Sequence, residues 1–242
     1  MWIFCCGMQR SGSTLQFQLT AGLVEEAGRG KRVEWVKPHR FKKLREKYAE
    51  DQSWKVFKSH VCAKHIAREF YLDNARGVYV YRDLRDVFVS AMRKYATTFE
   101  LLWNAPFLDE CLENYHKWTA LPHMLISRYE GMITALPAEV ARIARHLGLE
   151  ITPQRCEQIA AEYSIAKQLD RIDEAKRDGR LKHGVAKETL YDPRTNLHTN
   201  HIQSGGRGEW KKFLSQQQVE LIEGKAGDWL AAHGYELARQ IL

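Results

Sequence analysis

The residues from Gly7 to Thr14, Gly-Met-Gln-Arg-Ser-Gly-Ser-Thr, have the types and spacing of an anion-binding loop. They follow the apolar run 2–6 and precede a helical pattern that starts near Leu15. Glycines let main-chain N–H groups approach an anion, and the start of a helix adds partial positive charge. The G-x-x-x-x-G spacing matches a nucleotide P-loop, but Ser13 stands where that pattern has its lysine. The loop therefore favours a shorter anion over ATP, with Arg10 as its cation.

Polar residues also follow the ends of other predicted strands, where a parallel sheet binds its ligands. Lys58-Ser59-His60 follows one strand, Arg82 another, and Arg128-Tyr129-Glu130 a third. A neutral imidazole with a pKa of ~6.5 can accept a proton near neutral pH, so His60 is the candidate general base. A structural histidine remains the alternative, and His65 is its rival on a predicted helix.

The elements that must position these residues alternate between strand and helix, as in an α/β fold with a central parallel sheet of about four to five strands. The predicted strands are 2–6, 32–36, 54–58, 77–81 and 124–128. The predicted helices are 14–27, 39–50, 63–71, 83–95 and 108–120, followed in a mostly helical C-terminal half by 134–147, 153–162, 164–178 and 215–239. Residues 180–208 show no period and predict a long functional loop. We expect 1–242 to be one domain.

The composition narrows the class of protein. The chain has 37 Lys and Arg against 30 Asp and Glu, a net charge of +7 that suits an anionic ligand. It has no arginine-rich tract or aromatic RNA motif, so we expect no nucleic acid, and no apolar run near the ~20 residues of a membrane helix. The five cysteines are scattered, and a glycine loop at residue 7 leaves no room for a cleaved signal peptide. We therefore predict a reduced, cytoplasmic protein.

Four segments in order give the chain a resemblance to the sulfotransferases that use 3′-phosphoadenosine-5′-phosphosulfate (PAPS). They are 9–14 (Gln-Arg-Ser-Gly-Ser-Thr), 57–60 (Phe-Lys-Ser-His), 81–90 (Tyr-Arg-Asp-Leu-Arg-Asp-Val-Phe-Val-Ser) and 205–211 (Gly-Gly-Arg-Gly-Glu-Trp-Lys). The pair Tyr129-Glu130 matches one that borders the adenine in relatives. Two positions depart from the family: Gln203-Ser204-Gly205 replaces Arg-Lys-Gly, and Leu15 replaces an adenine-stacking aromatic residue.

The resemblance implies a P-loop-type sulfotransferase fold and transfer of a sulfuryl group from PAPS to a hydroxyl or amine of a small molecule. Adenosine 3′,5′-bisphosphate (PAP) would be the co-product, and no metal is expected. The implied catalytic residues are His60, Lys58 and Arg10. The implied nucleotide-binding residues are Gln9, Arg10, Ser11, Gly12, Ser13, Thr14, Arg82, Ser90, Tyr129, Ser204, Gly205, Gly206 and Arg207. Arg207 is a candidate to replace the missing cations of its loop, a question that the sequence leaves open.

Two other classes of function stay open at this point. One is a nucleotide-dependent kinase or NTPase on a P-loop-like fold, against which Ser13 argues. The other is an anion- or nucleic-acid-binding module without catalysis. The acceptor is not identified: Tyr95, Phe99, Trp103 and Phe107 form either core, which is the expectation, or a substrate slot. The stretch 180–200, with the nearby histidines His183, His198 and His201, is a candidate lid. A homodimer is compatible with the sequence. Arg85 and Asp86 are expected to form an ion pair.

Overall fold

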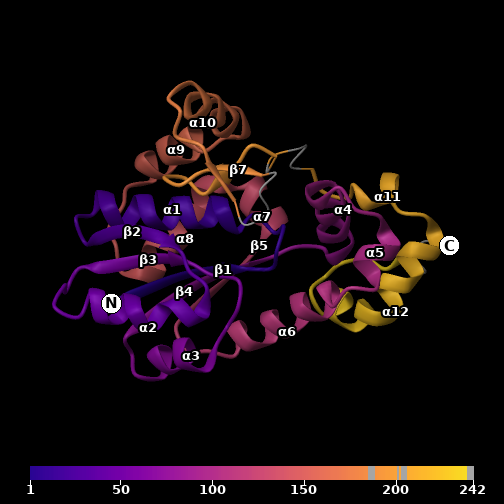
Figure 1. Cartoon of the computed structure of the whole chain (residues 1–242), viewed down its shortest axis with the longest axis horizontal. Helices are drawn as coiled ribbons and strands as arrows, with labels where there is room; N and C mark the ends of the chain where they lie inside the picture. The colour runs from indigo at the N-terminus through magenta and orange to yellow at the C-terminus, as the bar shows by residue number, and fades with distance from the viewer. Residues whose placement is uncertain (185–188, 201, 203–205, 239–242) are drawn as a thin grey trace.

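A five-stranded parallel sheet with the order β2-β3-β1-β4-β5 forms the centre of the molecule (Figure 1). The structure is a computed structural model that describes residues 1–184, 189–200, 202 and 206–238. The strands are β1 Trp2–Gly7, β2 Gly30–Trp35, β3 Trp54–Lys58, β4 Ala75–Tyr81 and β5 Met124–Arg128. All neighbours pair in parallel, so the five carboxyl ends emerge at one edge. The predicted α/β class and all five predicted strands are confirmed.

The sheet is buried on both faces. Ile3 and Cys5 of β1 pack into one apolar cluster, with residues of α1 and α8, whereas Phe4 and Cys6 pack into a second, larger cluster. This alternation follows from the two-residue repeat of a strand. Figure 1 shows α9 and α10 above the strands and α2, α3 and α6 below them. A sheet covered in this way holds the residues at its carboxyl edge in fixed positions.

Helices connect the strands and make up most of the second half of the chain. They are α1 Ser13–Glu26, α2 Phe41–Lys47, α3 Lys64–Tyr71, α4 Leu84–Tyr95, α5 Phe99–Trp103, α6 Phe107–Thr119, α7 Tyr129–Thr134, α8 Leu136–Leu147, α9 Pro153–Glu162, α10 Ile165–Arg177, α11 Trp210–Phe213 and α12 Gln216–Ala232, with a 3-10 turn η1 at Pro38–Arg40. The sequence did not predict α5, α7 or α11, which are too short to display a helical period. In the described chain, no helix combines the length and apolar character needed to cross a bilayer.

Two predicted boundaries are corrected by the structure. The last helix ends at Ala232 rather than at 239, because Gly234 adopts a left-handed backbone with φ 71° that terminates the helix. The stretch 180–208 is not a structureless loop: its described residues include a small antiparallel sheet of β6 Lys182–His183, β7 Leu190–Asp192 and β8 Leu197–His198. Strands of two or three residues show no alternation in the sequence.

This small sheet packs close to the first helix. The side chain of Gln18 on α1 donates a hydrogen bond of 2.8 Å to the carbonyl of Thr195, and Arg32 on β2 donates one of 3.1 Å to the carbonyl of Arg194. The segment is therefore tied to β2 and to α1, the helix that follows the glycine loop.

A buried charge network joins α4 to the C-terminal helix. Arg85 donates to the carboxylates of Asp83 at 2.7 Å and Glu223 at 2.6 Å, and its guanidinium lies 3.9 Å from the ring centroid of Trp210. The expected ion pair between Arg85 and Asp86 is wrong, because adjacent residues on a helix point in different directions.

Candidate active site

The glycine loop occupies the turn between β1 and α1, and its two glycines are required by space and by conformation. Gly12 has φ 88°, and a Cβ placed there would lie 2.7 Å from Cδ2 of Tyr129. A Cβ on Gly7 would lie 2.8 Å from the carbonyl oxygen of Val80. No side chain of the described residues caps α1 at Gly12, so the first N–H groups of the helix are left to bind an anion.

Two predicted nucleotide-binding side chains turn out to shape this loop. The hydroxyl of Ser11 lies 2.7 Å from the carbonyl oxygen of Met8 and 2.9 Å from that of Val80, and the side chain is fully buried. Gln9 accepts a hydrogen bond of 2.8 Å from the Tyr95 hydroxyl of α4. Both side chains are engaged in hydrogen bonds within the protein, and these contacts help to fix the geometry of the loop.

A concentration of positive charge lies beside the loop. Lys58 at the end of β3 is 6% exposed and donates a hydrogen bond of 2.5 Å to the hydroxyl of Thr14. Burial and the charges of Arg10 and Lys94 lower the pKa of Lys58 to about 7. Burial and the charge of Arg82 likewise lower the pKa of Arg10. Neighbouring positive charges repel one another, and a bound anion would offset this repulsion. The cluster is therefore suited to bind an anion.

Helix α4 carries two residues that face this positive site. The Arg10 guanidinium donates through Nε to the hydroxyl of Ser90 at 3.1 Å. One turn further on, Lys94 donates to the side-chain oxygen of Asn200, and burial and Arg10 lower the pKa of Lys94 to about 8. Sequence reasoning named Ser90 and missed Lys94, although their spacing of four residues places both on one helix face.

The small sheet also reaches the cations. Burial and the charges of Lys94, Lys58 and Arg10 lower the pKa of His198 on β8 to about 4. His198 and Asn200 therefore belong to the surroundings of the site. His183 is exposed on β6, and His201 lies outside the described residues.

Arg82, at the end of β4, forms a second cationic point on the same edge of the sheet. Its Nη2 donates a hydrogen bond of 2.6 Å to the carbonyl of Gly206, and its guanidinium lies 4.5 Å from the ring centroid of Tyr129. Its Nε is buried and has no hydrogen-bond partner among the described residues. A buried donor without a partner is costly, so this group is suited to a bound acceptor such as a phosphate oxygen.

Asp86 links Arg82 to the C-terminal segment. Its carboxylate accepts hydrogen bonds from the N–H groups of Gly208 at 2.7 Å and Trp210 at 3.0 Å, and it lies 3.6 Å from Arg82 Nη2. Arg207 is exposed beside this link. The predicted binding residues Ser204 and Gly205 lie outside the described residues.

His60 follows β3 and is oriented by the glycine loop. Its Nδ1 lies 2.9 Å from the carbonyl oxygen of Gly7. A carbonyl only accepts, so Nδ1 carries the proton and Nε2 is left as the proton acceptor. Burial and the charge of Lys58 lower the pKa of His60 to about 4, which keeps the ring neutral. The rival His65 instead lies 2.7 Å from the carbonyl oxygen of Pro38.

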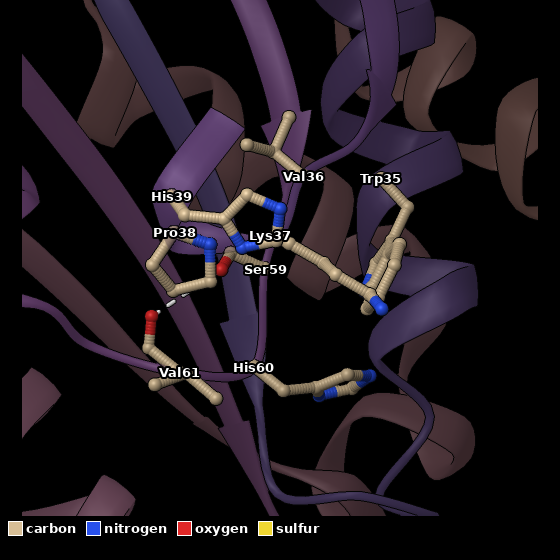
Figure 2. A pocket seen from close by; sticks show the side chains of 8 residues that line it. All are labelled: Trp35, Val36, Lys37, Pro38, His39, Ser59, His60 and Val61. Carbon is tan, nitrogen blue, oxygen red and sulfur yellow. Dashed lines mark hydrogen bonds between the residues drawn. The ribbon is translucent and has the colours of Figure 1, made fainter. Parts of the chain in front are cut away.

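A cavity of about 260 Å³ opens beside His60 (Figure 2). In the figure, Lys37 extends towards the Trp35 ring, and the His60 ring lies below both. The cavity is lined by Trp35, Val36, Lys37, Pro38, His39, Ser59, His60 and Val61. Sequence reasoning missed this cavity because its walls come from the ends of β2 and β3, which are distant along the chain.

The aromatic residues considered for a substrate slot belong instead to the core, as expected. The ring of Phe99 packs against Phe88 at a centroid distance of 5.2 Å and stacks on Trp103 at 5.8 Å, and Phe107 is buried beside them. Tyr95 is the exception, since it is half exposed.

Within the described residues, no group of three or more His, Cys, Asp or Glu side chains is arranged to hold a metal ion.

The chain is similar in fold to three solved structures that contain PAP. A retinol dehydratase in complex with androsterone and inactive cofactor PAP gives a TM-score of 0.66 at 20% identity, over 95% of this chain and 80% of that one. A retinol dehydratase with retinol and PAP gives 0.64 at 19% identity, over 95% and 81%. A mouse sulfotransferase complexed with PAP gives 0.63 at 14% identity, over 95% and 84%.

The comparison with curated proteins gives no match. The sequence model of the sulfotransferase domain, in contrast, matches residues 2–232, nearly the whole chain, and does not favour the kinase alternative. By that match, and with the expected segments gathered at one edge of the sheet, this chain belongs to the sulfotransferase domain family.

Proposed function

We propose that this sulfotransferase moves a sulfuryl group from PAPS to a hydroxyl or amine of a small molecule and releases PAP. The observation that carries the proposal is the group of cations on one sheet edge: Arg10 with Lys58 at the glycine loop, and Arg82 at the end of β4. PAPS has a phosphosulfate at one end and a 3′-phosphate at the other. All three structures reported above as similar in fold, two of retinol dehydratase and one of the mouse sulfotransferase, contain PAP.

The residues divide between the two ends of this nucleotide. The N–H groups of the glycine loop, with Ser13, Thr14 and Lys58, would hold the 5′ end. Arg82 would hold the 3′-phosphate by charge-assisted hydrogen bonds, its buried Nε being a donor without a partner in the described chain. The segment that contains Ser204, Gly205, Gly206 and Arg207 would close over this phosphate, with Ser90 on α4 and with Tyr129 beside the adenosine.

The chemistry at the 5′ end follows from the orientation of His60. When bound, PAPS supplies the sulfuryl group and a phosphate leaving group. The acceptor oxygen forms a bond to sulfur as the bond from sulfur to the bridging oxygen breaks, and His60 Nε2 takes the acceptor's proton and later passes it to water. Arg10 and Lys58 stabilise the negative charge that develops on the departing oxygen. Because such transfers depend on positioning and charge, these residues need no covalent intermediate.

Thermal unfolding of the wild-type chain with different nucleotides tests the donor. We expect PAP to raise the melting temperature and Mg-ATP to leave it unchanged, because a ligand stabilises the fold that binds it. Incubation with PAPS and a panel of acceptors, followed by mass spectrometry, should give products heavier by one sulfuryl group. Stabilisation by Mg-ATP without any response to PAP would support a kinase or NTPase instead.

Three further features of the proposal follow from the sequence. We infer that 1–242 acts as one sulfotransferase domain and works in the cytoplasm, which is consistent with its five free cysteines: Cys5, Cys6, Cys62, Cys111 and Cys156. A homodimer remains a prediction that light scattering of the purified protein tests.

A further inference from the structure

The cavity beside His60 combines a flat aromatic wall, a proton acceptor and a cation. Trp35 is partly buried at the end of β2, and Nζ of Lys37 lies 5.9 Å from its ring centroid. Val36 and Pro38 add apolar surface, and none of the eight lining residues is acidic. The Lys37 side chain is exposed and makes no ion pair within the described chain, so its charge is available to a ligand (Figure 2).

The size of the cavity restricts the acceptor. Pockets for drug-sized ligands measure about 300–1,000 Å³. At about 260 Å³, the cavity beside His60 falls just below that range. A volume of this size is sufficient for a compound with a single ring.

The surface around the cavity is strongly basic. Within 37–47, six residues are Lys or Arg: Lys37, Arg40, Lys42, Lys43, Arg45 and Lys47. A second cavity of about 420 Å³ is lined by Arg40, Lys43 and Lys47, with Val33, Leu44 and Tyr48. Arg45 is paired with Glu69 at 3.0 Å, whereas Lys42 and Lys43 form no ion pair with the described residues. A positive surface of this kind raises the local concentration of anionic molecules and speeds their association.

On the basis of the proposed function, we propose that the acceptor is a small phenolic compound that carries an anionic group. Its ring would pack against Trp35, its hydroxyl would face His60, and its anionic group would bind Lys37. The aryl oxygen forms the bond to sulfur as the bond from sulfur to the bridging oxygen of PAPS breaks. The proton of the phenol passes to His60, and PAP leaves. A second consideration agrees with this choice. Burial and Lys58 hold the pKa of His60 to about 4, and so weak a base serves an acidic phenol better than an aliphatic alcohol.

A matched pair of ligands tests the proposal without relying on turnover. The probes are 4-hydroxyphenylacetate and its uncharged isostere 4-hydroxyphenylacetamide, titrated calorimetrically into the enzyme saturated with PAP. We expect the wild-type complex to bind the carboxylate about tenfold more tightly than the amide. Lys37→Ala should remove that preference and leave affinity for the amide unchanged. Lys42→Ala, an exposed lysine of α2 that lines neither cavity, should retain the preference.

Each contrary outcome has a distinct meaning. Equal affinity of the wild-type complex for the two ligands would overturn the proposal, and so would a preference that survives Lys37→Ala. Binding of PAP without binding of either ligand would overturn the acceptor class while leaving the proposed sulfuryl transfer in place. A wild-type protein that fails to bind PAP would reject the proposed donor and the acceptor class together.

Discussion

The proposed donor end, at the glycine loop and Arg82, and the proposed acceptor end, at the cavity beside His60, are built in different ways. At the donor end, main-chain groups and buried side chains are tied to one another: Arg82 to the Gly206 carbonyl, Asp86 to two N–H groups, and Ser11 to two carbonyls. At the acceptor end, Lys37 and His39 are exposed and the wall of the cavity is formed by single side chains. The donor end is specified by backbone geometry, and the acceptor end by side-chain identity.

This difference has a consequence for substitutions. A change at the donor end must disturb several linked hydrogen bonds, so it should alter nucleotide binding and stability together. A change at the acceptor end should alter the choice of acceptor while stability stays constant. The following predictions test this contrast.

The largest effect is expected at His60, which lies between the two ends. His60→Ala should reduce turnover by ~10²–10⁴-fold, because the acceptor proton loses its base. PAP should still bind, as measured by calorimetry, because the proposal assigns His60 no direct contact with the nucleotide. His116→Ala, an exposed histidine on α6, is the control and should behave as wild type. Wild-type turnover by His60→Ala would remove this residue from the mechanism.

Arg82→Ala should weaken PAP binding by roughly 10–100-fold, the range for a hydrogen bond to a charged group. Adenosine 5′-phosphosulfate lacks the 3′-phosphate, so its affinity should change much less. The readout is the ratio of the dissociation constants for PAP and adenosine 5′-phosphosulfate. Loss of the contact between Arg82 and Gly206 would weaken the binding of both nucleotides and would leave this ratio unchanged. An equal loss for both nucleotides would show that Arg82 does not read the 3′-phosphate.

The lowered pKa of Lys58 predicts that the binding of the donor nucleotide depends on pH. Its pKa in the free protein is lowered to about 7, mainly by burial, so above pH 7 it is largely uncharged. A bound anion favours the charged form, so PAP binding should take up protons at pH 8. The affinity should fall as the pH rises, by up to about tenfold per pH unit.

Calorimetry in two buffers of different ionisation enthalpy measures this uptake. Lys58→Met should reduce it without removing it, because Lys94 has a pKa lowered to about 8 and contributes as well. The pKa of Lys58 is about 7 in the folded protein and 10.5 ordinarily, so between these pH values the unfolded chain binds more protons than the folded one. The stability of the free protein should therefore increase as the pH rises from about 7 to 10.5. Identical proton uptake in wild type and Lys58→Met would contradict the assignment.

The smallest effect is expected on the basic surface of α2. Replacing Lys43 and Lys47 by Glu should lower kcat/KM for an anionic acceptor a few-fold at low salt, and the effect should fade at ~1 M salt as charges are screened. Replacing two exposed lysines of α10, Lys167 and Lys176, by Glu serves as the control of equal charge change. A loss that persists at high salt would point to a direct contact rather than to electrostatic attraction.

The sequence predicted the elements that carry the proposed donor end because their signals are local. Glycine spacing defines the loop from Gly7 to Thr14, and the short apolar runs define all five strands of the sheet. His60 and Arg82 could be named because they follow strand ends directly. Their contacts, however, cross the fold: the partner of His60 is 53 residues away and that of Arg82 is 124 residues away. No local pattern encodes such pairings.

The proposed acceptor end was not predictable from the sequence, because its residues come together only when the strands pair in the sheet. Trp35 and Lys37 look like the end of an ordinary strand, and Val61 like the start of a loop. They form a cavity because β2 and β3 are neighbours in the sheet, which is a property of strand order. Lys94 was missed although a helical face pattern was available, and the strands of 182–198 are too short to show any pattern.

The hydrogen bond between His60 and the Gly7 carbonyl ties the proton acceptor to the phosphate loop itself. Any replacement that shifts the peptide at residue 7 would also rotate the imidazole of His60. A substitution intended to weaken nucleotide binding would then slow the proton transfer as well, and steady-state rates alone would not separate the two effects. Pre-steady-state measurements, with nucleotide occupancy and the chemical step followed separately, are needed to tell the two apart.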